Sequence, residues 1–189
     1  MVPGGERHSL SPVSIEVTYD ERLRAVPVDR EAYAAMVGGL KADLARLDAE
    51  GAADPSEVFR LLRRVGFGLV VLGEHGEAVS HLERALLLAE NPAALTAVRI
   101  NLADAHRHAG DLGRAEPLYL EALAIAPPDM RDFALQHLAK HRIDQNRLDE
   151  AETLLRESLE LREAKGDPEL IASTELALAH CRRHTENPD

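Results

Sequence analysis

The side chains of this sequence that are best suited to chemistry are its nine histidines. Two pairs stand four residues apart, His137 with His141 and His180 with His184, and Cys181 lies beside the second pair. On a helix this spacing brings two imidazole rings to one face, where they can share a metal ion. A transition-metal site normally has three or four ligands, and no carboxylate pattern of the zinc-protease kind accompanies either pair. We therefore predict no metal and no cofactor, with a metal-binding or catalytic role of the histidine pairs as an alternative.

Other catalytic patterns do not occur in the sequence. It contains no phosphate-cradling glycine loop and no nucleophile elbow. Gly66-Phe67-Gly68 lies inside a helical pattern, where close packing of helices explains the two glycines better than catalysis does. Serine and aspartate residues are scattered without the context of a catalytic triad. We therefore expect that the protein is not an enzyme.

A second group of functional candidates is cationic. Residues 59–72 carry three arginines and no acidic residue, whereas the segment 148–165 is strongly acidic. This contrast predicts a polarised molecule with a partly basic hollow and an acidic back. Arginine binds carboxylates through two parallel hydrogen bonds, and a concave wall focuses its field. The arginines are either part of a binding surface or ordinary solvated charges.

The bulk composition narrows the class of protein. The formal net charge of -11 repels phosphate backbones, so we expect no nucleic-acid partner. The single cysteine cannot form an internal disulfide, which suits a reducing compartment. The first ten residues lack the apolar stretch of a signal peptide, and the longest apolar runs are far too short to cross a bilayer. We predict a cytoplasmic protein without membrane contact, and the Ala-, Arg-, Leu- and Glu-rich composition suits a bacterium of high GC content.

Residues that punctuate helices recur along the chain at a nearly constant interval. Asp and Asn cap free N–H groups and Pro suits the first helical position, so four dipeptides predict helix starts about 36–40 residues apart. They are Asp54-Pro55, Asn91-Pro92, Pro127-Pro128 and Asp167-Pro168. Three further residues keep the same interval and suit the left-handed position that ends a helix. They are Gly73, Gly110 and Asn146.

Small residues recur at matching positions within each interval. Helix axes approach to about 8–10 Å only where side chains are short, so this pattern predicts tightly paired helices. The small residues of the first helices are Gly66, Ala103, Ala139 and Ala177. Those of the second helices are Ala78, Ala115 and Ala151, and later Ala85, Ala122 and Ser158. Between these sites stand the larger Leu82, Tyr119 and Leu155.

With these residues the chain resembles the tetratricopeptide-repeat (TPR) family over roughly residues 55 to 184. The resemblance implies an all-α fold in which antiparallel helix pairs stack into a right-handed superhelix, and the first helix of each pair lines a concave groove. Two departures are visible. His106, Arg142 and His180 stand where the family usually has aromatic residues, and the interval is longer than the usual 34 residues.

The groove surface is predicted one step around each first helix from its core face. We hypothesise that this surface binds an acidic or carboxylate-bearing segment of a protein or peptide. Chaperone-binding members of the family hold a terminal carboxylate with Lys, Asn and Arg in this region. Arg63 and Asn101 occupy comparable sites here, whereas Phe67, Phe133 and His137 replace other members of that clamp. The predicted groove residues are Arg60, Arg63, Arg64, Phe67, Val71, Asn101, Asp104, Arg107, His108, Gln136, His137, Lys140 and Asp144.

The two segments before the array have different patterns. Residues 29–51 predict a capping helix that begins after Asp29, with Gly38-Gly39 as a weak or kinked point. Residues 1–28 alternate apolar and polar side chains before a turn at Asp20-Glu21, which predicts an extended or hairpin arm. This arm is either a mobile tail or docks on the repeats of its own or a second copy, where Phe67, Val70 and Val71 suit docking. The alternating apolar residues are Val13, Ile15, Val17 and Tyr19.

We thus predict an arm at 1–28, a capping helix at 29–51, a repeat array at 54–184 and a tail at 185–189. The array contains the pairs 54–90, 91–126 and 127–166 and a closing helix at 167–184. We expect a non-catalytic scaffold or adaptor for a protein or peptide, able to form a homodimer through the arm or an array end. The alternative with the same groove is a bacterial regulatory sensor of a signalling peptide, in which the ligand changes the curvature of the array.

Overall fold

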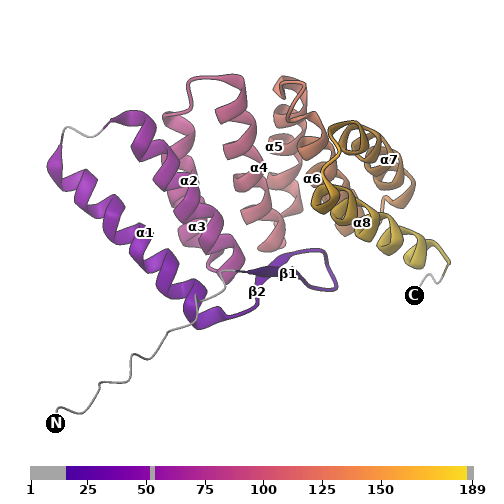
Figure 1. Cartoon of the computed structure of the whole chain (residues 1–189), viewed down its shortest axis with the longest axis horizontal. Coiled ribbons are helices and arrows are strands. Elements are labelled where there is room, and N and C mark those ends of the chain that lie inside the picture. The colour runs from indigo at the N-terminus through magenta and orange to yellow at the C-terminus, as the bar shows by residue number, and fades with distance from the viewer. Residues whose placement is uncertain (1–15, 52–53, 187–189) are drawn as a thin grey trace, which may run out of the picture.

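The computed structural model describes residues 16–51 and 54–186, and this part of the chain forms eight α-helices and a two-stranded sheet (Figure 1). The all-α, TPR-like superhelix with an N-terminal helix and a short β-like arm is confirmed. The elements are β1 (Val17–Tyr19), β2 (Ala25–Pro27), α1 (Arg30–Glu50), α2 (Pro55–Leu72), α3 (His75–Leu87), α4 (Pro92–His108), α5 (Leu112–Ile125), α6 (Arg131–Asp144), α7 (Leu148–Lys165) and α8 (Pro168–Glu186).

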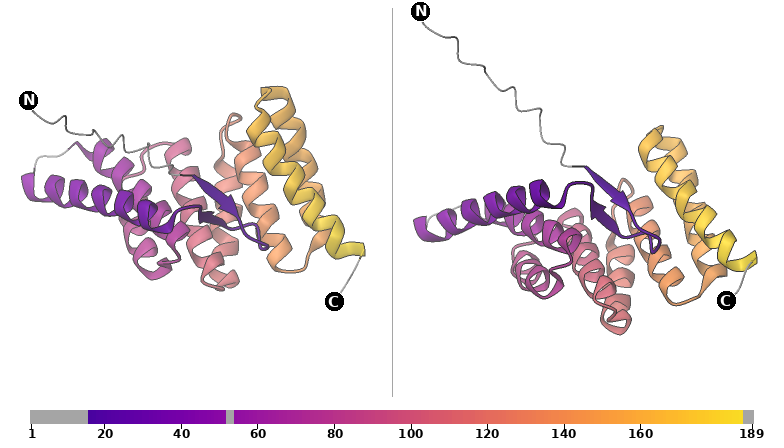
Figure 2. Two further views of the ribbon diagram at one scale, coloured as in Figure 1. Left: turned by 60° about the horizontal axis from the view of Figure 1, so that its bottom comes forward. Right: turned by 90° about the horizontal axis from the view of Figure 1, so that it is seen from below.

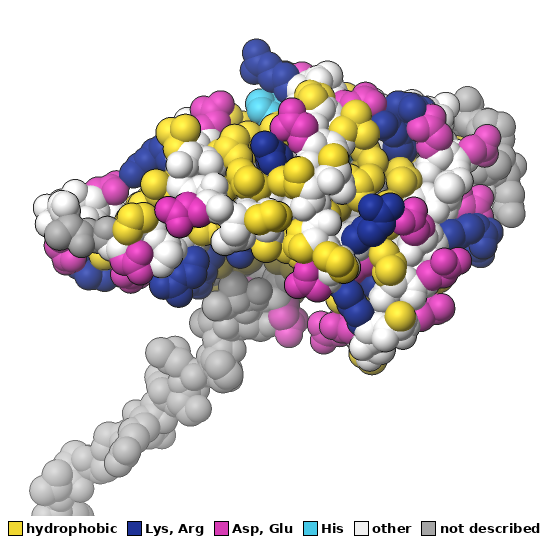
Figure 3. Space-filling view, turned by 90° about the horizontal axis from the view of Figure 1, so that it is seen from above, with side chains coloured by type: hydrophobic (Ala, Val, Ile, Leu, Met, Phe, Trp, Pro, Cys, Tyr) yellow, Lys and Arg dark blue, Asp and Glu magenta, His cyan; other side chains and the backbone are white. Residues whose placement is uncertain are grey.

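The helices are stacked in two layers. From α2 onward they pack in successive pairs, α2 with α3, α4 with α5 and α6 with α7, while α8 follows against α7 without a second helix of its own. The first helices α2, α4, α6 and α8 also contact one another in that order, and α1 packs against α2 (Figure 2). Seen from above, hydrophobic side chains gather in the middle of the molecule and charged ones lie mainly at its margin (Figure 3).

The recurring small residues lie where the helices come closest together. All the alanines of the pattern are completely buried, as are Leu82, Tyr119 and Leu155, which pack between them. At Gly66 even one methyl group does not fit, because its Cβ would lie 2.5 Å from the Cγ of Leu82 on α3. Gly68 allows the close approach of α1 to α2, since a Cβ at this position would lie 2.6 Å from Val37 on α1. Close packing, as predicted, therefore explains both glycines of this segment.

Local side-chain chemistry explains most of the helix ends. Three of the four predicted starts are confirmed, and in each the residue before the proline accepts a backbone N–H of the first turn at 2.9–3.0 Å. These caps are Asp54, Asn91 and Asp167. The predicted left-handed helix ends are also confirmed, with φ of 80°, 86° and 58°. They are Gly73, Gly110 and Asn146.

The prediction that Pro127-Pro128 begins a helix is wrong. Helix α6 begins three residues after Pro128, at Arg131, and Met130 before it forms no side-chain cap. The prolines lie in a turn instead, where the carbonyl oxygen of Pro127 accepts the backbone N–H of Met130 at 2.9 Å. Neither Asp nor Asn precedes the prolines, so no side chain is available to cap a helix that starts there.

Helix α1 covers the first repeat. It runs without interruption from Arg30 to Glu50, through Gly38 and Gly39. Asp29 caps it by accepting the backbone N–H of Ala32 at 3.0 Å, as its position before the helix predicted. Its buried leucines at 40, 44 and 47 form one stripe, and the first two belong to the core around α2, α3 and α4.

We predict that Gly66→Ala lowers the free energy of unfolding by about 1–3 kcal/mol, because the added methyl group overpacks the contact with Leu82. The matched control is Gly76→Ala on α3, where nothing lies within 4 Å of the new Cβ and the change should be neutral or slightly stabilising. Urea denaturation followed by circular dichroism at pH 7 measures both. Equal effects of the two substitutions would contradict the proposed packing role.

Candidate binding site in the groove

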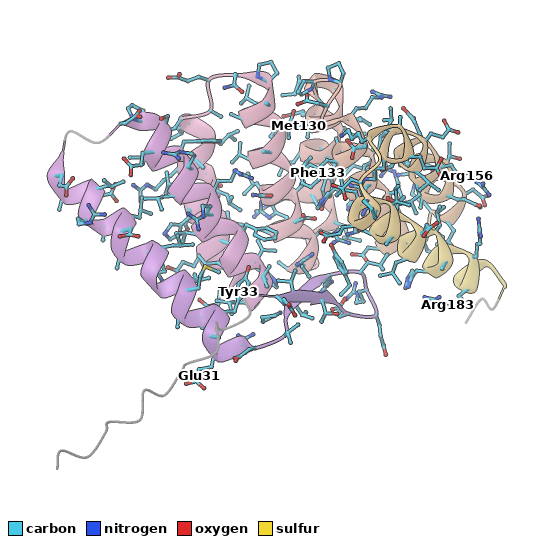
Figure 4. The ribbon with its side chains drawn as sticks, viewed as in Figure 1. Glu31, Tyr33, Met130, Phe133, Arg156 and Arg183 are labelled. Carbon is cyan, nitrogen blue, oxygen red and sulfur yellow. The ribbon has the colours of Figure 1, made fainter. Side chains whose placement is uncertain are left out.

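The concave side of the array contains a cavity of about 380 Å³ between the hairpin and the helices. The hairpin formed by β1 and β2 contributes one apolar wall, and the first helices, together with Arg162 of α7, contribute the opposite, mixed wall. The hairpin residues are Val17, Tyr19, Leu23 and Ala25. The helix residues are Phe67, Val70, Val71, Asn101, Asp104, Arg107, His108, Phe133, Gln136, His137, Lys140, Arg162, Glu169, Leu170 and Ser173. Phe133 comes from α6, near the middle of the row of helices (Figure 4).

The structure brings together most of the residues predicted to face the groove. Those on α4 and α6, together with Phe67 and Val71 on α2, line this one cavity, with the exception of Asp144, which lines a neighbouring hollow beside Arg22. The three arginines at 60, 63 and 64 lie elsewhere. They line a separate hollow of about 330 Å³ with Asp43 and Arg46 of α1, because α1 packs along this part of α2.

The centre of the cavity wall is a buried ionic network around Asp104. One carboxylate oxygen accepts the Tyr119 hydroxyl at 2.6 Å, and the Arg107 Nε lies 3.5 Å from the same oxygen. The other oxygen lies 2.8 Å from the His137 Nδ1. Burial alone would raise the pKa of Asp104, but His137 and Arg107 more than offset it and hold this pKa far below its usual range. Asp104 is therefore a fixed anion, and the Asp144 carboxylate lies 3.4 Å from the Arg107 Nη1.

His108 completes this network as a neutral ring. Burial, with the repulsion from Arg107 added, lowers the pKa of His108 to about 3 although Asp104 opposes the shift. The Arg107 Nη2 lies 3.0 Å from the His108 Nε2. A guanidinium can only donate, so this ring nitrogen must accept and the proton of the neutral ring resides on Nδ1.

A second buried network is built around Arg162 on α7. Its Nε donates to Asp132 at 3.0 Å, and its Nη1 donates to Gln136 at 2.5 Å and to Thr174 at 2.9 Å. The Gln136 amide nitrogen in turn donates to Ser173 at 2.8 Å. Arg162 was not among the predicted groove residues, because it lies on a second helix. The available signal was its place on the apolar stripe of that helix, seven residues after the buried Leu155.

Two buried polar side chains of the cavity wall, Lys140 and Asn101, are candidates for binding a ligand. Within the described part of the chain Lys140 forms no ion pair, and its ammonium lies 4.6 Å from the centre of the Tyr19 ring. Lys140 is 5% exposed, and burial together with the charge of Arg107 lowers its pKa to about 8. The Asn101 side-chain nitrogen is also buried and has no hydrogen-bond partner. Both groups are donors, so a ligand that satisfies them must supply acceptor atoms.

The two histidines of the first predicted pair lie in different surroundings. His137 lies beside Asp104, whereas His141 is completely buried, with its ring centroid 5.2 Å from that of Tyr119. The side chain of His184 lies outside the described residues. Among the described side chains, no group of three or more His, Cys, Asp or Glu is arranged to hold a metal ion.

Comparison with protein-family models agrees with this architecture of paired, stacked helices around a groove. Two models described as tetratricopeptide repeat match residues 57–127 and 134–169, which together are more than half of the chain. The molecule is thus a helical-repeat protein, and it belongs to the tetratricopeptide-repeat family. Repeats of this family generally mediate protein–protein interactions and are typically non-catalytic. No curated protein matches the chain. None of the helices in the described segments combines the length and apolar character needed to span a membrane.

We predict that Tyr119→Phe lowers the free energy of unfolding by about 1–3 kcal/mol, because it removes a buried hydrogen bond to the Asp104 carboxylate. Tyr19→Phe is the matched control, since Tyr19 is 41% exposed and should lose less than about 0.5 kcal/mol. Chemical denaturation at pH 7 measures the two losses, and similar values would contradict a structural role of the network.

We predict that Lys140→Met raises the free energy of unfolding at pH 7 by about 1–3 kcal/mol, because a buried charge without an ion pair is removed. The folded-state pKa of Lys140 is about 8 and the ordinary pKa of a lysine is 10.5, so the unfolded chain holds this proton to higher pH. Between these values the wild type therefore gains stability as pH rises, and the advantage of the variant should shrink. Denaturation at pH 7 and pH 9.5 tests this, with the half-exposed Lys41→Met as control.

Proposed function

We propose that this chain is a scaffold or adaptor that holds a protein or peptide segment in its concave groove, and that a carboxylate of the segment binds at Lys140 and Asn101. The observation that carries this proposal concerns two polar side chains of one cavity wall. The buried Asn101 amide nitrogen has no hydrogen-bond partner, and the Lys140 ammonium faces an aromatic ring but has no ion pair within the described segments. A protein normally pairs or hydrogen-bonds such groups, since a buried polar group without a partner costs about 1–3 kcal/mol.

The charges around the cavity favour a carboxylate at Lys140 rather than at the neighbouring arginines. Arg107 already faces Asp104 and Asp144, and Arg162 already binds Asp132. A ligand anion gains less near these neutralised guanidinium groups than at an ammonium that has no ion pair. The Asn101 amide lines the same cavity and offers a second donor to the ligand, which favours a segment with an acidic side chain or a chain terminus.

The apolar part of the cavity wall supports a peptide or protein as the occupant. Phe67, Val70 and Val71 on α2 and Leu170 on α8 line the same cavity as the two donors. Predominantly apolar walls with a few fixed polar groups are typical of ligand sites, where the apolar area supplies affinity and the polar groups orient the ligand. A segment with apolar side chains beside its carboxylate would use both kinds of wall.

The three arginines of α2 form a second surface, which we include in the proposal as an extension of the partner site. In the described segments Arg60, Arg63 and Arg64 form no ion pair, and burial lowers the pKa of Arg63. They lie i, i+3 and i+4 on one helix and therefore share a face. A partner long enough to pass from the cavity along α2 would meet them with further acidic residues.

The proposal predicts that Lys140→Met lowers recovery of the partner about tenfold or more, because a charge-assisted hydrogen bond to a ligand is lost. Affinity capture from the native cell with cross-linking mass spectrometry, using wild-type and variant protein as bait, measures the recovery. Capture by the wild type should also weaken as pH rises from 7 to 9, since Lys140 loses its proton near pH 8.

Two controls make this test specific. Lys41→Met removes a lysine on α1 that is paired with Glu77 outside the groove and should leave capture unchanged. Charge reversal to Glu at Arg60, Arg63 and Arg64 reports whether the partner reaches the second surface. Recovery that is equal for wild type and Lys140→Met at pH 7 would refute the carboxylate site.

A further inference from the structure

The β-hairpin lies on the concave side of the array, against the first helices (Figures 1 and 2). Its strands are antiparallel and short, with Val17 opposite Pro27 and Tyr19 opposite Ala25. All of β1 is exposed and β2 is half-buried. An isolated two-stranded hairpin is marginally stable at best in water, so the position of this one depends on its contacts with the helices.

The turn at the tip of the hairpin positions Leu23 toward the helices. The Asp20 carboxylate accepts the backbone N–H groups of Arg22 and Arg24 at 2.9 and 2.8 Å, which closes the turn. Leu23 adopts a left-handed backbone with φ of 56°, a conformation that branched residues rarely take. Its side chain is 5% exposed and belongs to the core cluster at the C-terminal end of the array. Other members of that cluster are Ala139, Ala177, Leu178 and Cys181.

Further contacts tie the hairpin to the earlier repeats. Ala25 packs against the core of the first repeat, and the Arg24 Nη1 donates to the carbonyl oxygen of His108 at the end of α4, at 3.2 Å. Arg22 lies 3.9 Å from Asp144 at the end of α6. The Tyr19 ring covers the ammonium of Lys140. One short segment thus occupies the groove surface of α2, α4, α6 and α8 at the same time.

This docking leaves several groups unsatisfied. The Arg24 Nε is buried without a hydrogen-bond partner, and burial together with the charge of Arg22 lowers the pKa of Arg24. Lys140 faces an aromatic ring where a carboxylate would bind it more strongly, and the cavity of about 380 Å³ remains beneath the strands. A ligand that fills this space and supplies acceptors would fit the same surface better than the hairpin does.

We propose that the hairpin is an intramolecular ligand of the groove, which a partner must displace to reach the full surface of α4, α6 and α8. The inference rests on the proposed function of the groove as the partner-binding surface. The displacing partner places an apolar side chain in the Leu23 site and, unlike the hairpin, a carboxylate at Lys140. The partner therefore binds more weakly than it would bind an open groove. Its apparent Kd equals the Kd for the open groove divided by the fraction of molecules in which the hairpin has left.

The test uses the full chain and the hairpin itself as the probe. In the Leu23→Asp variant a charge enters the apolar cluster, so its own hairpin should leave the groove. A cyclised peptide of residues 16–28 is added to isotope-labelled protein at about 1 mM. This concentration is needed because the protein's own tethered hairpin competes at a millimolar effective concentration. We expect shifts of the α4 and α6 amide signals in the variant and at least about tenfold weaker binding to the wild type.

Two controls keep the result interpretable. Val28→Asp places the same charge on a hairpin residue that is 61% exposed, and this variant should behave like the wild type. A cyclised peptide that carries Leu23→Asp should bind none of the proteins. Equal binding of the unmodified peptide to wild type and Leu23→Asp, or to neither, overturns the proposal.

Loss of helical circular dichroism in Leu23→Asp alone also overturns it, since the hairpin would then be part of the folded core. The proposed function fails separately. If the peptide binds the Leu23→Asp variant but Lys140→Met captures the partner as well as the wild type does, the hairpin is a groove ligand and the carboxylate site is wrong.

Discussion

The structure depends on how closely its helices approach one another. At Gly66 the space for a side chain is already filled by Leu82, and the matching alanines of the later repeats are completely buried. Short side chains at these positions let each pair close and let each first helix lie beside the next. The concave wall follows from that geometry, and with it the placement of Asn101 on α4 and Lys140 on α6 around one cavity. Larger residues at the contact points would push the helices apart and so separate these two donors, although neither donor itself would be changed.

The groove contains several buried charged side chains, and these are not equivalent. Arg107 and Arg162 each reach buried carboxylates, so they act as fixed structural cations. They also repel Lys140, whose charged form the site disfavours. An array that needed only stability would be better served by an apolar residue at that position. Under the proposed function, the ammonium at this position is a cost to folding that a bound carboxylate offsets.

Local signals made the array predictable, and long-range contacts limited the prediction of the site. Caps such as Asp54 and left-handed residues such as Gly73 act within one turn, so the sequence shows them directly. The predicted helix start at Pro127-Pro128 was wrong because a proline without a capping residue before it suits a turn as well as a helix start. The groove residues of α4 and α6 were found from helical periodicity together with the family resemblance, which implies that the first helix of each pair lines the concave side. The separation of Arg60 from the cavity and the contribution of Arg162 both depend on packing between helices, which periodicity does not reveal.

The hairpin also changes the mechanics of the molecule. In most repeat arrays each unit contacts only its neighbours, so the array is flexible along its length and its terminal repeats can unfold independently. Here the segment around Leu23 and Arg24 links the last helices to the first and middle repeats, although it precedes them all in the chain. Such a tie couples repeats that are not adjacent and resists opening of the superhelix. While it is in place, the array should unfold as a single cooperative unit, and its release would restore the stepwise behaviour of an open solenoid.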